Sequence, residues 1–225
     1  MDCEVLYKAM IKYDSVMKQE LGWSFLKNNV LTGTSMAEKI YFGKYYKGGL
    51  YTMADDMANY CRRAYKGGLT DTFRTGIFDR VISADINSSY PHQMTKAPLP
   101  VGKSFMITIN RPYSGEPLLE GIYRVVVKST PMNLLYPCLG DIIDGKLCFS
   151  HWQNHEMSIT KEELVYAFGE GYQFHILDAC VCERTSDIYH DYIFGAYEER
   201  RELKKKMAQA KQDGDMVAYT KYNIA

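Results

Sequence analysis

RVISADINSSYPHQM, residues 80–94, places one acidic residue, Asp85, where an apolar segment gives way to the start of a helix. The β-branched and small residues of 81–86 favour a short, largely buried strand. Alternation along that strand puts Asp85 on the face opposite the more apolar one, so its carboxylate can point into a cleft. Ser88 or the serine after it can cap the following helix, and Pro91 suits its first turn. The predicted order is strand, carboxylate, turn, helix.

A carboxylate in that position has two interpretations. Mg²⁺ prefers oxygen ligands and usually takes one or two carboxylates together with substrate phosphates, which makes Asp85 a candidate metal ligand. A lone aspartate after a strand is, however, more often a helix cap or a turn residue. Spacing alone leaves both interpretations open.

The full string DINSSYP, residues 85–91, is more specific. It resembles motif A of the family B DNA polymerases, in which Asp, two or three intervening positions, Ser, a variable residue, Tyr and Pro follow in order. Upstream, Tyr65-Lys66-Gly67-Gly68 resembles the Tyr-basic-Gly-Gly element that joins the exonuclease and polymerase domains in the protein-primed branch of that family. The Arg62-Arg63 pair and residues 99–102 are also similar to family sequence. The chain therefore resembles a protein-primed polymerase of bacteriophage or linear-plasmid type.

The Tyr-Lys-Gly-Gly element has a physical rationale as a DNA contact. Paired glycines let a backbone approach a phosphate closely, and neighbouring cations supply counter-charge. The alternative is a plain flexible turn. The same letters occur at 46–49, but the second copy is preferred because it follows an Arg-Arg pair and lies closer to Asp85. The DNA-binding candidates are Arg62, Arg63, Tyr65, Lys66, Gly67 and Gly68.

Composition sets broad limits on the protein class. The 225 residues are 46% hydrophobic, enough for a substantial core in one or two compact units, and the formal net charge is zero. Any nucleic-acid surface must then be a local basic patch. The six cysteines fall at no recognisable zinc spacing, which favours a reduced, cytoplasmic protein. No apolar run approaches the ~20 residues of a membrane span, so no membrane association is expected.

Periodicity and turn signals predict the remaining elements. Helices are expected at 2–20, 35–42, 53–63 and 160–169, and strands at 104–109, 122–128 and 174–183. Asp2 resembles the aspartate of the third exonuclease motif, a second potential metal ligand, although the tyrosine that usually precedes that aspartate is not found. The alternative for Asp2 is a favourable charge at a helix N-terminus.

Residues 197–211, YEERRELKKKMAQAK, predict a charged helix that resembles the start of the polymerase fingers. Its cations, with Arg200, Arg201 and Lys204 as candidates, could face a nucleotide triphosphate. Intervening glutamates three or four residues away favour instead an ordinary solvated helix face held by intrahelical pairs.

The resemblance implies an α+β fold, a partial palm with an inserted α+β subdomain and flanking helices. It divides the chain into the end of an exonuclease-like region (1–64), the linker motif and motif A (65–95), an insertion like terminal-protein region one (96–185) and the start of the fingers (186–225). It also implies deoxynucleotidyl transfer with two Mg²⁺ ions bound by Asp85 and the Ile86 carbonyl. Ser88 and Tyr90 would lie at the nucleotide. The implied partners are template-primer DNA, deoxynucleoside triphosphate and a priming terminal protein.

Two further family motifs are not found, namely a Lys followed by Asn-Ser-x-Tyr-Gly and an Asp-Thr-Asp. With one palm carboxylate, the isolated chain is expected to be inactive. Three interpretations remain: a piece of a longer polymerase, one subunit of a split enzyme, or a non-catalytic module that binds DNA or terminal protein.

Overall fold

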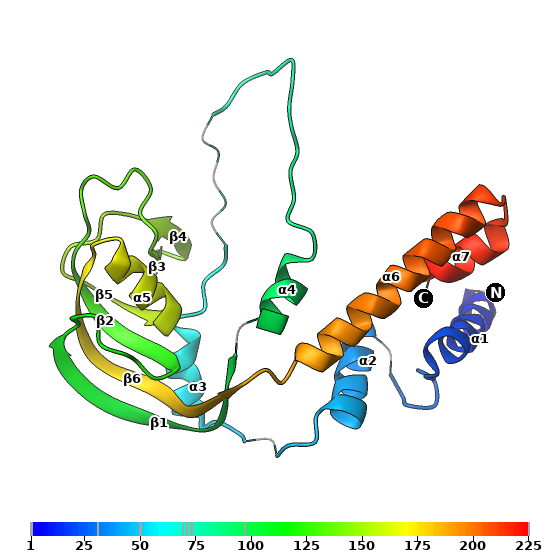
Figure 1. Cartoon of the computed structure of the whole chain (residues 1–225), viewed down its shortest axis with the longest axis horizontal. Coiled ribbons are helices and arrows are strands. Elements are labelled where there is room, and N and C mark those ends of the chain that lie inside the picture. Colours follow the sequence, from blue (N-terminus) through cyan, green and yellow to red (C-terminus); the bar gives the residue numbers. More distant parts are fainter. Residues whose placement is uncertain are drawn as a thin grey trace. The chain divides into compact units, whose positions relative to one another are not determined.

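The computed structural model describes residues 2–30, 32–49, 51–68, 70, 72, 74–96 and 98–224. The chain forms two compact units, each assembled from separate stretches of sequence (Figure 1). The helical unit comprises Met1–Gly49, Ser88–Ala97 and Asp187–Ala225, and the sheet unit comprises Leu50–Asn87 and Pro98–Ser186. The division therefore passes through the motif A string, between Asn87 and Ser88.

Helices provide the regular structure of the helical unit. They are α1 (Asp2–Leu21), α2 (Gly33–Ile40), the π-helical turn η1 (Tyr41–Tyr45), α4 (Ser89–Lys96), α6 (His190–Gln212) and α7 (Met216–Ile224). After Gly214, whose φ of 73° is a left-handed conformation that glycine adopts without strain, α7 packs against α6 (Figure 1). The helices predicted near the N-terminus, at 35–42, after motif A and at 197–211 are confirmed, and the last begins earlier than predicted.

Asp14, in the middle of α1, holds the loop that follows this helix. Its Oδ1 accepts hydrogen bonds from the Ser24 hydroxyl at 2.8 Å and from the Leu26 N–H at 3.1 Å, and Lys18 Nζ lies 2.7 Å from Oδ2. Burial raises the pKa of Asp14, but the three donors outweigh burial and lower that pKa to about 2. The loop is thereby tied to α1 by an ionised carboxylate.

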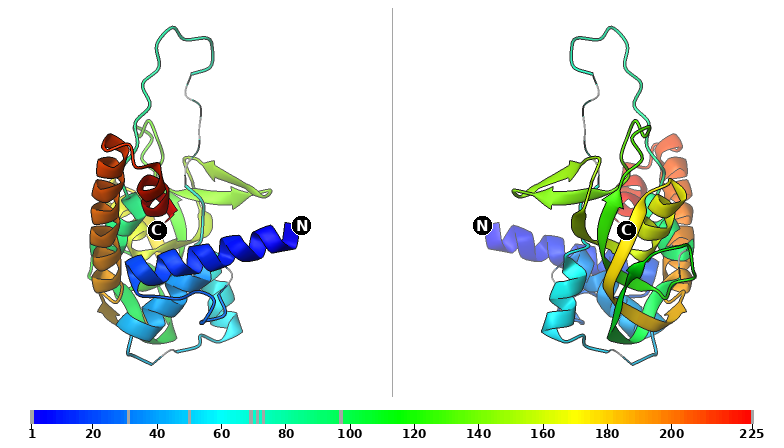
Figure 2. Two further views of the ribbon diagram at one scale, coloured as in Figure 1. Left: turned by 90° about the vertical axis from the view of Figure 1, so that its right-hand side faces the viewer. Right: turned by 90° about the vertical axis from the view of Figure 1, so that its left-hand side faces the viewer.

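An antiparallel sheet organises the sheet unit. Within the described residues its strands lie in the order β1 (Leu99–Pro112), β6 (Gln173–Ser186), β2 (Gly121–Ser129) and β5 (His155–Thr160). The two longest strands, β1 and β6, run side by side (Figure 2). A separate hairpin pairs β3 (Gly140–Ile143) with β4 (Lys146–Phe149). The helices of this unit are α3 (Asp55–Arg62) and α5 (Lys161–Gly169).

The two faces of the sheet differ in character. One face is apolar and packs against Leu164 and Ala167 of α5 to form the core. Its fully buried side chains include Tyr123, Val125, Val127, Ile159, Ile176 and Val181. A capping box starts α5, because the Thr160 hydroxyl accepts from the Glu163 N–H at 3.1 Å while the Glu163 carboxylate accepts from the Thr160 N–H at 2.8 Å. The opposite face carries charged side chains and is met by α3.

The strand and helix predictions in this unit are largely confirmed. The strands expected at 104–109, 122–128 and 174–183 lie within β1, β2 and β6, and the helices expected at 53–63 and 160–169 correspond to α3 and α5. Strands β3, β4 and β5 were not predicted. They are short, at four to six residues, and without long-range partners their patterns do not stand out.

The predicted strand at 81–86 is wrong. These residues form neither helix nor strand, and all of them are exposed. Ile82, predicted to lie on a buried face, is 90% exposed. A strand needs a hydrogen-bonding neighbour and an apolar surface to cover it, and the strands of the described residues pair only with one another. The helix predicted after it is present as α4, with Pro91 in its first turn.

Among the described residues, no helix combines the length and apolar character that crossing a bilayer requires.

Leu164→Ala should destabilise the sheet unit by about 2–5 kcal/mol, because Leu164 is fully buried in the core and its truncation leaves a cavity. Val165→Ala on the same helix should cost less than ~1 kcal/mol, since Val165 is 45% exposed. Urea unfolding followed by Trp152 fluorescence in a Trp23→Phe background isolates the sheet unit. Equal losses of stability for both variants would contradict the assigned core.

Candidate functional site

The motif A segment is open to solvent. Residues 81–87 are exposed, and the chain then turns into α4 through Ser88, whose φ is 52°. Tyr90, in the first turn of α4, is 86% exposed. A tyrosine with that exposure does not belong to a hydrophobic core, and its ring is accessible to a ligand.

Asp85 fits one position of a magnesium site. Its carboxylate is exposed and, among the described residues, takes part in no hydrogen bond or ion pair. Such a carboxylate, together with the Ile86 carbonyl, suits a hard cation that also binds substrate phosphates. In the described part of the chain, however, no group of three His, Cys, Asp or Glu side chains is placed to hold a metal ion. Asp85 thus offers one carboxylate, and a metal site at this position would require further ligands.

Asp2 stands at the start of α1, as predicted. Its side chain lies outside what the structure describes, so the exonuclease-like role stays a prediction.

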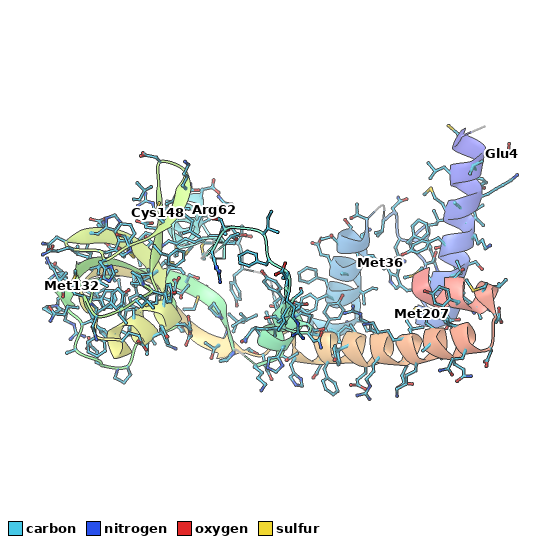
Figure 3. The ribbon with its side chains drawn as sticks, turned by 90° about the horizontal axis from the view of Figure 1, so that it is seen from above. Glu4, Met36, Arg62, Met132, Cys148 and Met207 are labelled. Atoms are coloured by element: carbon cyan, nitrogen blue, oxygen red, sulfur yellow. The ribbon has the colours of Figure 1, made fainter. Side chains whose placement is uncertain are left out.

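The Tyr65–Gly68 loop follows directly from the end of α3. Tyr65 is 85% exposed, and Arg63, Gly67 and Gly68 are exposed as well. Arg62, labelled in Figure 3, donates to Asn59 Oδ1 at 3.0 Å and is otherwise open to solvent. Two guanidinium groups and an aromatic ring therefore project from one short stretch of the sheet unit.

Lys66 behaves differently from its neighbours and does not fit the predicted phosphate contact. Its side chain is only 7% exposed, and its ammonium donates to the Ser158 carbonyl at 3.1 Å and lies 3.7 Å from Asp141 Oδ1. An ammonium removed from water needs such partners, because unpaired burial of a charge is costly. The positive charge of Lys66 is used inside the protein.

The charged face of the sheet explains how α3 is held. Arg124 donates from Nε to both Asp178 carboxylate oxygens at 3.1 Å and from Nη1 to Glu156 at 3.0 Å, and Tyr60 of α3 donates to Asp178 Oδ1 at 2.8 Å. The Arg124 hydrogen bonds hold the pKa of Asp178 below its usual range despite burial. Burial, followed by the contact with Asp178, raises the pKa of Tyr60.

This network was not predicted from the sequence. Arg124, Glu156 and Asp178 each resemble ordinary outward-facing positions in alternating strands. What brings them together is the pairing of Arg124 with Asp178 across β2 and β6, and of β2 with β5. No local signal specifies that register.

On α6, the structure separates paired from unpaired cations. Arg201 lies 2.6 Å from Glu198 and Lys205 lies 2.7 Å from Glu202, as expected for a solvated helix face. Arg200 and Lys204, one turn apart and exposed, have no such partner among the described residues. Met207, labelled in Figure 3, lies on the same helix and is partly buried.

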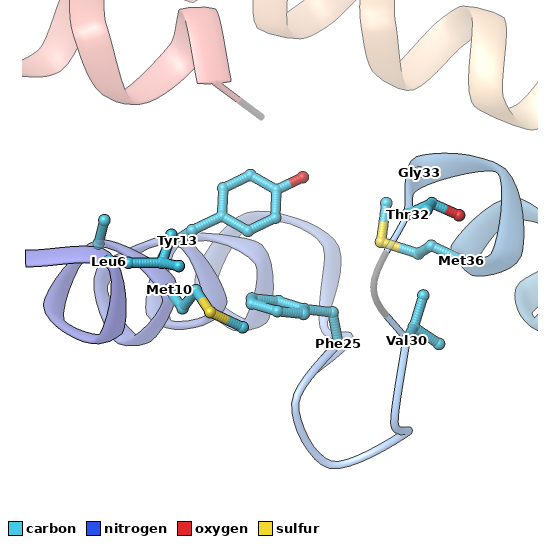
Figure 4. A pocket seen from close by; sticks show the side chains of 9 residues that line it. Leu6, Met10, Tyr13, Phe25, Val30, Thr32, Gly33 and Met36 are labelled. Atoms are coloured by element: carbon cyan, nitrogen blue, oxygen red, sulfur yellow. The ribbon is translucent and has the colours of Figure 1, made fainter. Parts of the chain in front are cut away.

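Two further features belong to the helical unit. The first Tyr-Lys-Gly-Gly copy turns in on itself, since Tyr46 donates to the Gly49 carbonyl at 2.9 Å and Lys47 to the Gly43 carbonyl at 2.5 Å. An apolar pocket of about 530 Å³ lies between α1, the following loop and α2 (Figure 4). Its lining includes Leu6, Met10, Tyr13, Phe25, Val30 and Met36.

Comparison with known proteins identifies the family. The family described as DNA polymerase type B, organellar and viral, matches residues 1–213. The chain belongs to this family. The DNA polymerase of Acidianus bottle-shaped virus (isolate Italy/Pozzuoli) is 26% identical over 160 residues, which cover 64% of this chain and 23% of the viral protein. The solved structure of phi29 DNA polymerase complexed with primer-template DNA is similar at a TM-score of 0.50 and 17% identity, over 85% of this chain and 33% of that chain.

This type B polymerase chain thus spans about a quarter of the viral relative and a third of the phi29 chain. The predicted family is confirmed by the match over 1–213, and the predicted α+β polymerase fold by the likeness to phi29 polymerase. The assignments of individual site residues and of the four chain segments stay predictions.

Asp178→Asn should reduce the acid sensitivity of the sheet unit. The pKa of Asp178 is lowered by folding, so its stabilising effect is present above the unfolded carboxyl pKa and is lost as pH falls through the folded value. The free energy of unfolding of the wild type should therefore fall more steeply than that of Asp178→Asn between about pH 5 and pH 2.

The matched control is Asp144→Asn, an exposed aspartate in the β3–β4 turn. Its pH profile should follow the wild type. Parallel profiles for Asp178→Asn and the wild type would show that Arg124 and Tyr60 do not stabilise the carboxylate.

Proposed function

We propose that this chain supplies the motif A aspartate, the linker and part of the nucleotide-binding surface of a DNA-directed DNA polymerase that copies viral or plasmid DNA from a protein primer. The observation that carries the proposal is the DINSSYP string at 85–91, which lies inside the region matched by the type B family. The solvent-open, unpartnered carboxylate of Asp85 supports it.

The proposed reaction is attack of a primer hydroxyl oxygen on the α-phosphorus of a deoxynucleoside triphosphate. A phosphorus–oxygen bond forms to the primer, the bond to pyrophosphate breaks, and the hydroxyl proton passes to solvent. Bound Mg²⁺ would neutralise charge on the attacking and leaving oxygens. Asp85 and the Ile86 carbonyl are the groups of this chain proposed to hold it.

Ser88 and Tyr90 are proposed to position the nucleotide. The exposed ring of Tyr90 offers a flat surface for the deoxyribose, and its bulk would leave no room for a 2′-hydroxyl, the group that distinguishes ribonucleotides. The backbone of Ser88 has the left-handed conformation and starts the turn into α4. The Ser88 carbonyl accepts a hydrogen bond from the His92 N–H at 3.0 Å.

Among the α6 cations, Arg200 and Lys204 are the stronger candidates for the triphosphate. Neither is neutralised within the described part of the chain, whereas Arg201 already pairs with Glu198. An unpaired cation binds a phosphate without first breaking an internal ion pair.

Arg62, Arg63 and Tyr65, with the exposed backbone of Gly67 and Gly68, are proposed to contact template DNA. The guanidinium groups would neutralise phosphates, and the paired glycines would allow close approach of the backbone.

The segment division of the chain is also a proposal. Residues 1–64 would close an exonuclease-like region, 65–95 carry the linker and motif A, and 186–225 begin the fingers. Residues 96–185, which hold the strands of the sheet unit, would contact a priming terminal protein in the host cytoplasm. The deoxynucleotide, the template-primer and the priming protein would then be the partners of the complete polymerase.

Asp85→Ala, in a polymerase that combines this chain with the finger motif and the second palm carboxylate, should lower the rate of primer extension by about 10³-fold or more, because a carboxylate that holds the charge-neutralising metal is removed. The control is Asp79→Ala, an exposed aspartate of the same loop, which should leave the rate unchanged. Single-nucleotide extension with Mg²⁺ measures both.

The isolated chain should show no extension under the same conditions. Extension by the chain alone that Asp85→Ala abolishes would show that its catalytic unit is complete, and equal rates for the two aspartate variants would remove Asp85 from the site.

The double variant Arg62→Ala/Arg63→Ala should weaken DNA binding by this chain and lower the slope of log K against log salt concentration by about two, because each arginine is expected to neutralise one phosphate. Arg111→Ala serves as control, because Arg111 is paired with Glu116 at 2.9 Å. Fluorescence anisotropy with a labelled primer-template at several salt concentrations gives the slopes. An unchanged slope in the double variant would refute the assignment.

A further inference from the structure

We infer that Asp141 is a positioning residue for the Tyr65–Gly68 loop, and that Lys66 is the internal anchor of this loop and not one of its phosphate contacts. The inference rests on the proposed function, because DNA binding by the loop is what gives its position a purpose. Arg62 and Arg63 would then contact phosphates, whereas the nearby Lys66 would hold the loop in place.

The loop has little else to fix it. Tyr65 is 85% exposed, and a Cβ added to Gly67 or Gly68 would meet nothing within 4 Å. The Tyr65 N–H donates to the Arg62 carbonyl at 3.0 Å, which holds the entrance to the loop. Lys66 is thus the loop side chain that reaches the rest of the sheet unit.

Lys66 is held by two separate elements. Its ammonium donates to the Ser158 carbonyl on β5 at 3.1 Å and lies 3.7 Å from Asp141 Oδ1 on β3. With 7% of the side chain exposed, the charge is shielded from solvent. Transfer of this ammonium to a DNA phosphate would leave Asp141 partly buried without that counter-ion, so the internal pair competes directly with any phosphate contact.

Asp141 is itself rigidly placed. Its Oδ1 accepts from the Ile142 N–H at 2.9 Å, and its Oδ2 lies 2.7 Å from His155 Nε2. The His155 ring stacks on Trp152, with 4.2 Å between ring centroids and 20° between planes. A carboxylate fixed by a hairpin, a strand and a stacked imidazole can define where Lys66, and with it the loop, must lie.

The experiment compares Lys66→Met, Asp141→Asn and the double variant with Lys146→Met, an exposed lysine of the β3–β4 hairpin. Met keeps the length and apolar stem of Lys66, and Asn keeps the shape of Asp141. The first measurement is hydrogen exchange of the Ala64 and Tyr65 amides, which donate to Cys61 and Arg62 carbonyls. The second is the salt dependence of primer-template binding.

Lys66→Met removes the contacts with both Ser158 and Asp141 and should speed exchange of these amides about tenfold, whereas Asp141→Asn leaves the Ser158 contact and should speed exchange less. The double variant should add little to the effect of Lys66→Met, because the Lys66–Asp141 interaction is already lost in that variant. Amides of β2 and β6 should keep wild-type protection. Lys146→Met should change neither measurement. For DNA, Lys66→Met should weaken binding while leaving the salt slope at the wild-type value, and Lys66→Arg should restore part of the affinity.

The inference is overturned if Lys66→Met lowers the salt slope by about one, which is the result expected when a phosphate-binding cation is removed. It is also overturned if exchange at Ala64 and Tyr65 is unchanged, or if exchange accelerates equally throughout the sheet, which would indicate a general loss of stability. Absence of DNA binding in the wild type would contradict the proposed function, and hydrogen exchange would still decide whether Asp141 and Lys66 anchor the loop.

Discussion

The ion pair between Arg124 and Asp178 is the interaction on which the polar face of the sheet unit depends. The guanidinium bridges β2, β6 and β5, because it donates to Asp178 on one side and to Glu156 on the other. Partly buried charges are costly unless their remaining donors and acceptors are satisfied. The Tyr60 hydroxyl supplies such a contact to Asp178, and it brings α3 against the sheet. The pair thereby helps to place α3, the helix from which the Tyr65–Gly68 loop follows.

The sequence predicts those helices and strands that a single local pattern of residues is enough to specify. Helix α1 has apolar residues at helical intervals. Strands β1, β2 and β6 are long, contain β-branched residues and are bounded by turns. β5 was missed because His155 and Glu156 lead into it, so its apolar residues are few. The prediction for 81–86 failed for the opposite reason. This segment has a strand's composition, but a strand also needs a neighbour, and the described strands provide none.

The residues of the candidate site also fall into those that a local motif predicts and those whose environment depends on packing. Motif order was enough to recognise the family and to predict Asp85 and Tyr90 as site residues, since a motif of fixed spacing can be recognised without knowledge of packing. Burial could not be predicted for Lys66, because its partners Asp141 and Ser158 lie more than seventy residues further along the chain. A lysine beside two arginines looks like a third member of a basic patch. The structure shows that the Lys66 ammonium instead contacts Asp141 of the β3–β4 hairpin and the Ser158 carbonyl of β5.

A chain with zero net charge can bind a polyanion only through cations that its own carboxylates leave free. In the structure, some basic residues are paired with a carboxylate and others are not. Lys66, Arg124, Arg201 and Lys221 lie against Asp141, Asp178, Glu198 and Glu20 respectively. In the described part of the chain, Arg200 and Lys204 are exposed and take part in no such pair, and Arg62 contacts only the neutral Asn59. Arg63 is exposed and forms no ion pair among these residues, but its charge helps to lower the pKa of Asp178. Internal pairing thus reduces the number of cations that remain available to a polyanion, and it leaves one set near Gly67 and Gly68 and the other along α6.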